Sequence, residues 1–206
     1  DLFQGYCRNL QGTQPNHIEI VVEKDAVAPI LRPIAMEYRI PMTVSRGHCS
    51  LPPRAGIVNR FERSGKDKLA LLILSDLDAD GVEICHVLPR SLRDDFGVPA
   101  SQLHPVRVAL TAEQASDLKL PNALSPKTKS VNCKKFVTEF GERCWELDAL
   151  SPAQLQNITR EAIDGVSDLD ALNAEIEQEK LDAARLSAIK AAATQALAGL
   201  TLDGGP

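Results

Sequence analysis

Three aspartates follow a run of apolar residues near the middle of the chain. Leu69 to Leu74 reads LALLIL, and Asp76, Asp78 and Asp80 come directly after it. Such a run is typical of a strand that is buried on both faces of a parallel sheet, so the aspartates would lie at its carboxyl end. Carboxylates this close repel one another by several kcal/mol at an intermediate dielectric. A raised carboxyl pKa or a bound divalent cation relieves this repulsion, and we expect the cation.

A further acidic residue follows another short apolar run. Residues 18–22 read IEIVV, and Glu23 comes next. In open α/β sheets, sites assemble just beyond the carboxyl ends of the strands, so we expect Glu23 to lie near the aspartates. Oxygen ligands of this kind suit Mg²⁺, with Mn²⁺ as the other ion considered, and bound Mg²⁺ keeps positions for waters and substrate phosphates. The expected chemistry is therefore metal-assisted reaction at a phosphate.

The elements around these residues alternate between strand and helix. Asp25 is expected to cap the first helix, and Thr111 to cap a short helix after the last strand. This order favours a parallel sheet of about four strands with right-handed crossovers, so the expected fold class is α/β with helices on the sheet. The pattern predicts strands at 18–22, 42–44, 69–74 and 106–110, and helices over 25–38, 52–63, 81–96, 152–164 and 168–200.

Three parts are expected along the chain. Residues 1–17 resemble the tail of a preceding element, and since the chain begins at Asp1 we expect an upstream domain. Residues 18–165 form the α/β domain. Residues 166–206 are rich in Ala, Glu and Leu at helical spacing and form a helical extension, which is more often an accessory or dimer element than a catalytic one.

Composition narrows the function classes only a little. A net charge of -5 argues against a strongly basic nucleic-acid module but leaves room for a local basic groove. Five scattered cysteines without a CxxC pair support neither a disulfide framework nor a zinc site, which favours reduced thiols in the cytoplasm. No apolar run approaches the roughly 20 residues of a membrane-spanning helix.

Basic residues at two places are candidates for contact with DNA phosphates. Arg46 and His48 follow the second strand at the same expected rim, and an arginine offers a bidentate fork to a phosphate. The segment 119–135 supplies the other candidates, Lys127, Lys129, Lys134 and Lys135. The alternative is that Arg46 and His48 are ordinary surface residues of a turn and that the lysines belong to a solvated loop.

The two acidic segments together resemble a known family. Val22-Glu23-Lys24 followed by Ser75-Asp76-Leu77-Asp78 is similar to the Toprim domain of topoisomerases, primases and some nucleases. The spacing Asp-x-Asp-x-x-Gly-x-x-Ile, which ends here at Gly81 and Ile84, is most similar to the A subunit of topoisomerase VI and its meiotic DNA-breaking relatives. The segment 145–162, WELDALSPAQLQNITREA, resembles the closing part of that branch. The resemblance covers residues 18–165.

This resemblance implies roles for the acidic residues. It implies that Glu23 is a metal ligand or general acid/base and that Asp76 and Asp78 bind Mg²⁺, while Asp80 either assists or caps the next helix. It also implies DNA as the partner. In the family, the strand-cutting tyrosine belongs to a winged-helix domain that precedes Toprim, so we expect neither Tyr6 nor Tyr38 to be the nucleophile, and we expect that domain upstream of this chain.

Other interpretations of the acidic residues remain open. An EF-hand loop would need a glutamate where Val87 stands, and a phosphatase-like aspartate nucleophile leaves Glu23 unexplained. A simpler alternative is that Glu23 caps a helix and the aspartates form a solvated turn. A different class of function is a non-catalytic assembly module with a vestigial acidic site, in which the long carboxyl-terminal helix forms a homodimer.

Overall fold

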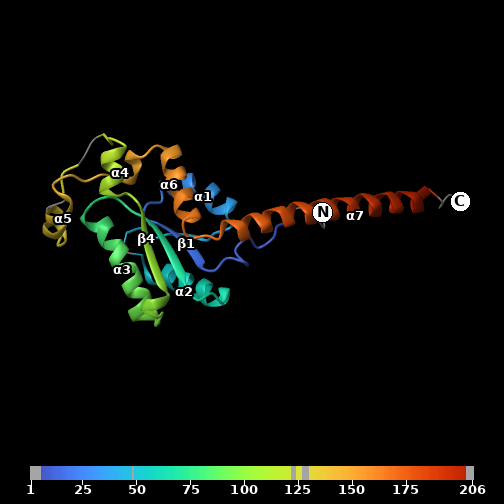
Figure 1. Cartoon of the computed structure of the whole chain (residues 1–206), viewed down its shortest axis with the longest axis horizontal. Helices are drawn as coiled ribbons and strands as arrows, with labels where there is room; N and C mark the ends of the chain where they lie inside the picture. The colour runs from blue at the N-terminus through green and yellow to red at the C-terminus, as the bar shows by residue number, and fades with distance from the viewer. Residues whose placement is uncertain (1–5, 48, 122–123, 127–129, 203–206) are drawn as a thin grey trace.

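A four-stranded parallel sheet forms the centre of the molecule in the computed structural model, which describes residues 6–47, 49–121, 124–126 and 130–202. The strand order is β2-β1-β3-β4, and every pairing is parallel (Figure 1). This confirms the expected α/β fold class and the number of strands. The strands are β1 (His17–Val22), β2 (Met42–Val44), β3 (Leu69–Leu74) and β4 (Leu103–Ala109).

Helices cover both faces of this sheet. Helices α1 and α6 pack against one another on one face, and α2 and α3 lie on the other. Figure 1 shows α7 leaving this layered body and extending away from it. The helices are α1 (Ala28–Glu37), α2 (Leu51–Ser64), α3 (Ala79–Phe96), α4 (Ala112–Asp117), α5 (Cys133–Phe140), α6 (Pro152–Asp164) and α7 (Leu169–Leu202).

The central strand β3 explains the apolar run. Its residues alternate between two hydrophobic clusters: Leu72 and Leu74 pack with α1 and α6, whereas Leu71 and Ile73 pack with α2 and α3. All six residues of β3 are buried. Because helices cover both faces, neither face of this strand needs polar side chains.

Local capping signals are partly right and partly wrong. Thr111 begins α4 with a capping box, in which its hydroxyl accepts from the Gln114 amide and the Gln114 side chain accepts from the Thr111 amide. Asp25 was expected to cap the first helix, but α1 begins at Ala28 after Val27, and no side chain caps it. The carboxylate of Asp25 instead accepts a hydrogen bond of 2.7 Å from Arg46. An ion pair with a residue 21 positions away therefore replaces the expected local cap.

Two other segments differ clearly from the expectation. Strand β4 begins at Leu103, earlier than position 106, because its first half pairs with β3 along the edge of the sheet. Residues 119–135 were expected to form a basic loop, whereas α5 begins at Cys133. This helix forms because Phe136 inserts into the core beside α3 and α4, and Phe136 also contacts Phe140 at 5.3 Å between ring centroids.

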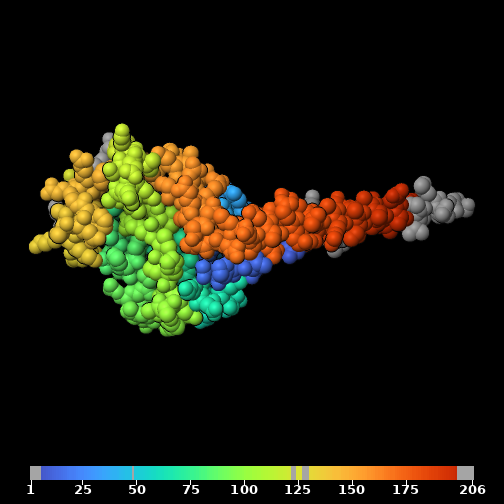
Figure 2. Space-filling model, viewed as in Figure 1, coloured from blue at the N-terminus to red at the C-terminus, as the bar shows by residue number. Residues whose placement is uncertain are grey.

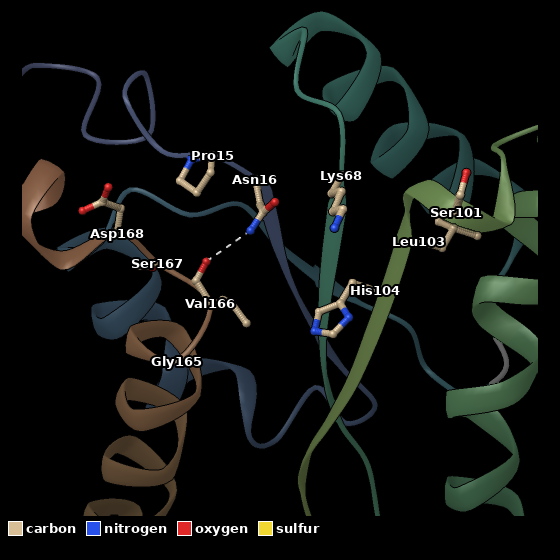
Figure 3. A pocket seen from close by; sticks show the side chains of 10 residues that line it. All are labelled: Pro15, Asn16, Lys68, Ser101, Leu103, His104, Gly165, Val166, Ser167 and Asp168. Atoms are coloured by element: carbon tan, nitrogen blue, oxygen red, sulfur yellow. Dashed lines mark hydrogen bonds between the residues drawn. The ribbon is translucent and has the colours of Figure 1, made fainter.

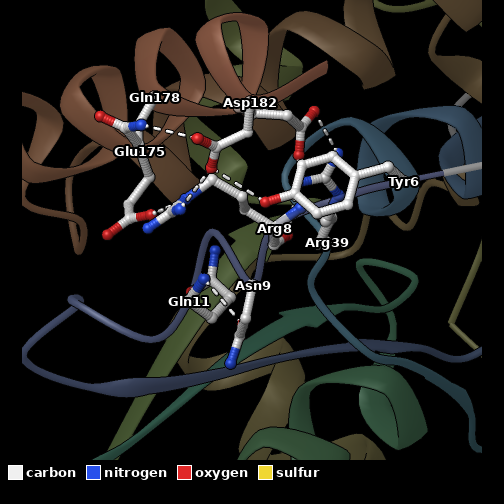
Figure 4. A network of polar contacts seen from close by, with 9 residues as sticks. Tyr6, Arg8, Asn9, Gln11, Arg39, Glu175, Gln178 and Asp182 are labelled. Atoms are coloured by element: carbon white, nitrogen blue, oxygen red, sulfur yellow. Dashed lines mark hydrogen bonds and ion pairs between the residues drawn. The ribbon is translucent and has the colours of Figure 1, made fainter. Parts of the chain in front are cut away.

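The first half of α7 is attached to the body by charged contacts with the amino-terminal segment and with Arg39, which follows α1 (Figure 4). Arg8 pairs with Glu175 at 2.7 Å and with Asp182 at 2.8 Å, and Arg39 pairs with Glu179 at 2.6 Å. From Ala183 to Ala198 the side chains of α7 are largely exposed, and Figure 2 shows this part of the helix standing clear of the rest. Among the described residues, no helix combines the length and the apolar character needed to cross a membrane.

Candidate functional site

The carboxyl ends of β1 and β3 bring two acidic residues together. These strands are neighbours and pair Val22 with Leu74, so the residues that follow them emerge at one edge of the sheet. The Glu23 amide donates to the Leu74 carbonyl at 2.9 Å. The Asp76 amide in turn donates to Oε2 of Glu23 at 2.9 Å. Glu23 and Asp76, which are 53 residues apart in the chain, are therefore in direct contact.

Asp76 is the most enclosed member of the group, with 4% of its surface exposed. Its Oδ1 accepts from the Leu147 amide at 2.8 Å, and its Oδ2 pairs with the Lys24 ammonium at 3.0 Å. The same ammonium pairs with Glu146 at 3.2 Å. The interpretation of the aspartates as a solvated turn is therefore wrong for Asp76, and Glu23 does not cap α1.

Asp78 and Asp80 have different contacts. Asp78 is the N-cap of α3, because its Oδ1 accepts from the amides of Asp80 at 3.1 Å and Gly81 at 2.8 Å. The cap considered for Asp80 is thus supplied by Asp78. Asp80 lies in the first turn of α3, where its Oδ1 accepts from the Ser130 hydroxyl at 2.8 Å.

Burial perturbs the two carboxyl groups that touch. Burial raises the pKa of Glu23, the hydrogen bond from the Asp76 amide opposes this, and the charges of Asp76 and Asp78 raise it further. Burial also raises the pKa of Asp76, against the Leu147 amide and the Lys24 ammonium. Both pKa values are raised mainly because the carboxylates are removed from water, so a proton or a bound cation would be favoured at these two groups.

The donor set fits a hard divalent cation in its chemistry. Glu23, Asp76 and Asp78 offer carboxylate oxygens at one edge of the sheet, which is what Mg²⁺ prefers in proteins. Among the described residues, no group of three or more His, Cys, Asp or Glu side chains is already arranged to hold a metal ion. Lys24 occupies one oxygen of Asp76. A cation that used this oxygen would therefore have to displace the ammonium.

Arg107, which sequence reasoning missed, supports the acidic turn from strand β4. Its Nη2 donates to the Asp76 carbonyl at 2.8 Å and its Nε donates to the Leu110 carbonyl at 2.9 Å. Burial lowers the pKa of Arg107, while the charges of Glu23 and Asp78 act in the opposite direction. The signal in the sequence was an arginine placed between valines in an apolar strand, where burial needs an acceptor.

Gly81 allows the close approach of α3 to the acidic turn. A Cβ atom at this position would lie 2.3 Å from the Asp76 carbonyl oxygen. The Ser75 hydroxyl also donates to the Gly81 carbonyl at 2.7 Å. A glycine is therefore needed here for space, and not for an unusual backbone angle.

Among the described residues expected to bind phosphate, Arg46 follows β2 at the same edge of the sheet, because its amide donates to the Glu23 carbonyl at 3.0 Å. Arg46 is exposed and pairs with Asp25, and on α5 Lys135 lies 3.7 Å from Glu83 while Lys134 is exposed. The cation in contact with the Asp76 carboxylate is Lys24, which was not selected as a site residue. His48, Lys127 and Lys129 lie outside the described residues.

A separate pocket of about 420 Å³ lies at the opposite, amino-terminal end of the strands (Figure 3). Lys68 and His104 line it where β3 and β4 begin. Asn16 donates to the Val166 carbonyl at 3.4 Å along its wall. Because parallel strands all run away from this end, the pocket is distant from the acidic edge.

Comparison with protein-family models and with curated proteins gave no match for this chain. The geometry of the acidic edge therefore carries the functional argument.

Proposed function

We propose that the chain is a Toprim-fold domain, related to the A subunit of topoisomerase VI, that binds Mg²⁺ and positions a DNA phosphodiester for strand cleavage. The contact between Glu23 and Asp76 carries this proposal, because the Toprim resemblance rests on a glutamate and an Asp-x-Asp pair after two separate strands. The parallel sheet agrees with such a domain.

In this proposal Glu23, Asp76 and Asp78 bind Mg²⁺, and Mn²⁺ can replace it. Asp80 is a further candidate ligand close to them. The bound ion would supply charge stabilisation to the phosphate and to the leaving 3′ oxygen. Glu23 also suits a general acid/base role, because burial raises the pKa of its carboxyl group.

The nucleophile in this proposal is water or a tyrosine from an upstream winged-helix domain. Within this chain, Tyr38 is a poor candidate. Its hydroxyl donates to Asp164 at 2.9 Å on the α1/α6 face, and burial together with this contact raises the pKa of Tyr38 to about 12. A phenol held in this way is hard to ionise at neutral pH.

Contacts with the DNA backbone complete the proposal. Arg46 and His48 follow β2, and a further set of lysines belongs to α5 and the segment before it. The proposed lysine contacts are Lys127, Lys129, Lys134 and Lys135.

The odd number of scattered cysteines is in keeping with a reducing location such as the cytoplasm.

Calorimetry with Mg²⁺ tests the metal site. We expect the wild-type chain to bind Mg²⁺, and both Glu23→Gln and the double variant Asp76→Asn/Asp78→Asn to lose binding. Asp117→Asn on exposed α4 removes the same charge elsewhere and should bind like the wild type. Absence of binding to the wild-type chain, with DNA present, would refute the proposal, as would binding that both site variants retain.

A second candidate function is a non-catalytic assembly module. The exposed second half of α7 favours it, since Ile189 has 57% of its surface exposed. An apolar side chain at this exposure suits burial in a homodimer interface. Removal of the residues after Asp182 should then convert a dimer to a monomer in light scattering, and a mass that the truncation leaves unchanged would count against assembly through α7.

A further inference from the structure

A pocket of about 800 Å³ lies between α4 and the segment that runs from the end of α5 to Trp145. Figure 1 shows α4 and α5 at the end of the molecule from which α7 points away. Lys119 lines the pocket after α4, and Phe140, Arg143 and Trp145 line it from the other side. A cavity of this volume is typical of a binding site for a small ligand.

Aromatic rings form part of the pocket wall. Trp145 is the only tryptophan of the chain, and its indole N–H donates to the Leu120 carbonyl at 3.4 Å. Phe140 is held by its contact with the buried Phe136. Since the polar edge of the indole is already occupied, the ring offers apolar surface to a ligand. Rings fixed in this way lose little entropy when a flat ligand stacks on them.

Two cations accompany the rings. Lys119 and Arg143 are exposed, and neither forms an ion pair or a side-chain hydrogen bond within the described part of the chain. Glu142 is the one carboxylate among the lining residues, so the lining carries a net positive charge. Aromatic surface for a base together with cations for a phosphate is the combination that binds single-stranded nucleic acid.

The pocket adjoins the acidic edge through the backbone. The Leu77 amide donates to the Trp145 carbonyl at 2.8 Å, and the Trp145 amide donates to the Leu77 carbonyl at 3.1 Å. In an antiparallel pair that exchanges both hydrogen bonds, the two Cα atoms are about 5.5 Å apart. Leu77 lies between Asp76 and Asp78, so the wall that carries Trp145 borders the acidic edge directly.

We infer that this pocket holds an unpaired nucleotide of a DNA strand, with its base against Trp145 and Phe140 and its phosphate near Lys119 and Arg143. A single strand is favoured over a duplex because paired bases are already stacked and cannot enter a pocket. The inference deepens the proposed function, on which it rests for the choice of DNA. The nucleotide contacts involve no metal, so they can be tested separately.

Fluorescence of the single tryptophan reports on this site directly. We expect a single-stranded octathymidylate, added in EDTA at low salt, to quench Trp145 emission in a saturable way. An oligomer of the same length without bases should bind more weakly and leave the emission nearly unchanged. Binding of both oligomers with equal affinity would overturn the inference, because it would mean contact with the backbone alone.

Two variants separate the base contact from the phosphate contact. Trp145→Leu, followed by anisotropy of a labelled octathymidylate, should bind about tenfold more weakly or worse. Arg143→Gln should reduce the dependence of log K on log salt by about 0.7, the value for one phosphate contact on a single strand. Arg185→Gln, on the exposed part of α7, removes the same charge elsewhere and should change neither quantity. If Arg143→Gln behaves like Arg185→Gln and emission is not quenched, the inference is wrong.

The metal titration distinguishes this outcome from failure of the proposed function. Quenching in EDTA by a chain that does not bind Mg²⁺ would leave the nucleotide pocket standing and remove the metal site. Mg²⁺ binding without quenching would retain the metal site and rule out the nucleotide pocket. Because Arg143 is exposed, its variant also answers the question if Trp145→Leu fails to fold.

Discussion

Gly81→Ala should destabilise the protein, although it replaces glycine by alanine inside a helix. In an ordinary helix this change is favourable by up to about 1 kcal/mol, because alanine loses less backbone entropy on folding. Here the new Cβ would lie 2.3 Å from the Asp76 carbonyl oxygen, and 3.4 Å is the near limit of ordinary contact. The start of α3 and the acidic turn must therefore separate by about 1 Å, the difference between these two distances.

This separation would stretch three short hydrogen bonds. Asp76 accepts from Arg107 through its carbonyl at 2.8 Å and donates to Glu23 through its amide at 2.9 Å, and Ser75 donates to the Gly81 carbonyl at 2.7 Å. Weakening two of these partly buried bonds costs about 1 to 3 kcal/mol each. After the gain in helix propensity, we expect a net loss of about 3 kcal/mol in the free energy of unfolding.

Urea denaturation followed by circular dichroism measures this loss. Gly56→Ala in α2 is the matched control, because its Cβ would meet only Nη1 of Arg60, at 3.3 Å, so a shift of about 0.1 Å reaches the ordinary contact distance of 3.4 Å and leaves the pair of Arg60 with Glu19 in place. We expect Gly56→Ala to be neutral or stabilising by roughly 0.5 kcal/mol. If Gly81→Ala is as stable as Gly56→Ala, the close packing of α3 against the acidic turn is not what the geometry indicates.

Three further predictions concern charged contacts. Arg60→Met leaves the fully buried Glu19 carboxylate without its bidentate partner, at 2.7 and 3.0 Å, and should cost about 3 kcal/mol in urea denaturation, whereas an unchanged midpoint would contradict the pairing. Lys24→Met removes the ammonium that competes with a cation at the acidic edge, so calorimetry should show Mg²⁺ bound about tenfold more tightly, and weaker binding would refute the competition. The Arg39 guanidinium and a backbone amide lower the pKa of Glu179 to about 2, so its stabilising contribution is complete above its ordinary value of 4.5 and is lost as pH falls towards 2; unfolding measured across this range should depend less on pH in Glu179→Gln than in the wild type.

The central strand could be predicted from sequence because its pattern has a single physical explanation. An unbroken run of six apolar residues requires cover on both faces, and the two hydrophobic clusters provide it. Helix α6 was equally clear, since Ser151 and Pro152 are local start signals that act within a few residues. Sequence reasoning therefore placed correctly those elements whose cause is a local signal or the residue pattern along one strand.

Contacts between distant residues could not be predicted in this way. The ammonium of Lys24 reaches Asp76 and the guanidinium of Arg107 reaches its carbonyl because the sheet order places β1, β3 and β4 side by side. Helix α5 has little local signal, and the burial of Phe136 in the tertiary structure stabilises it. Asp25 failed as a cap for the same reason, since its partner Arg46 lies after another strand.

The ammonium of Lys24 gives the acidic edge an internal counter-ion. Proteins whose carboxylate or thiolate clusters have no such partner depend on a metal to fold, and chelators unfold them. In this chain the strand ends can close around Asp76 before any ion arrives, since a covalently attached positive charge is already within 3.0 Å. Folding is thereby separated from the supply of metal. The melting temperature should accordingly be the same in EDTA and in a buffer without chelator, and an ion that enters later exchanges one positive charge for another.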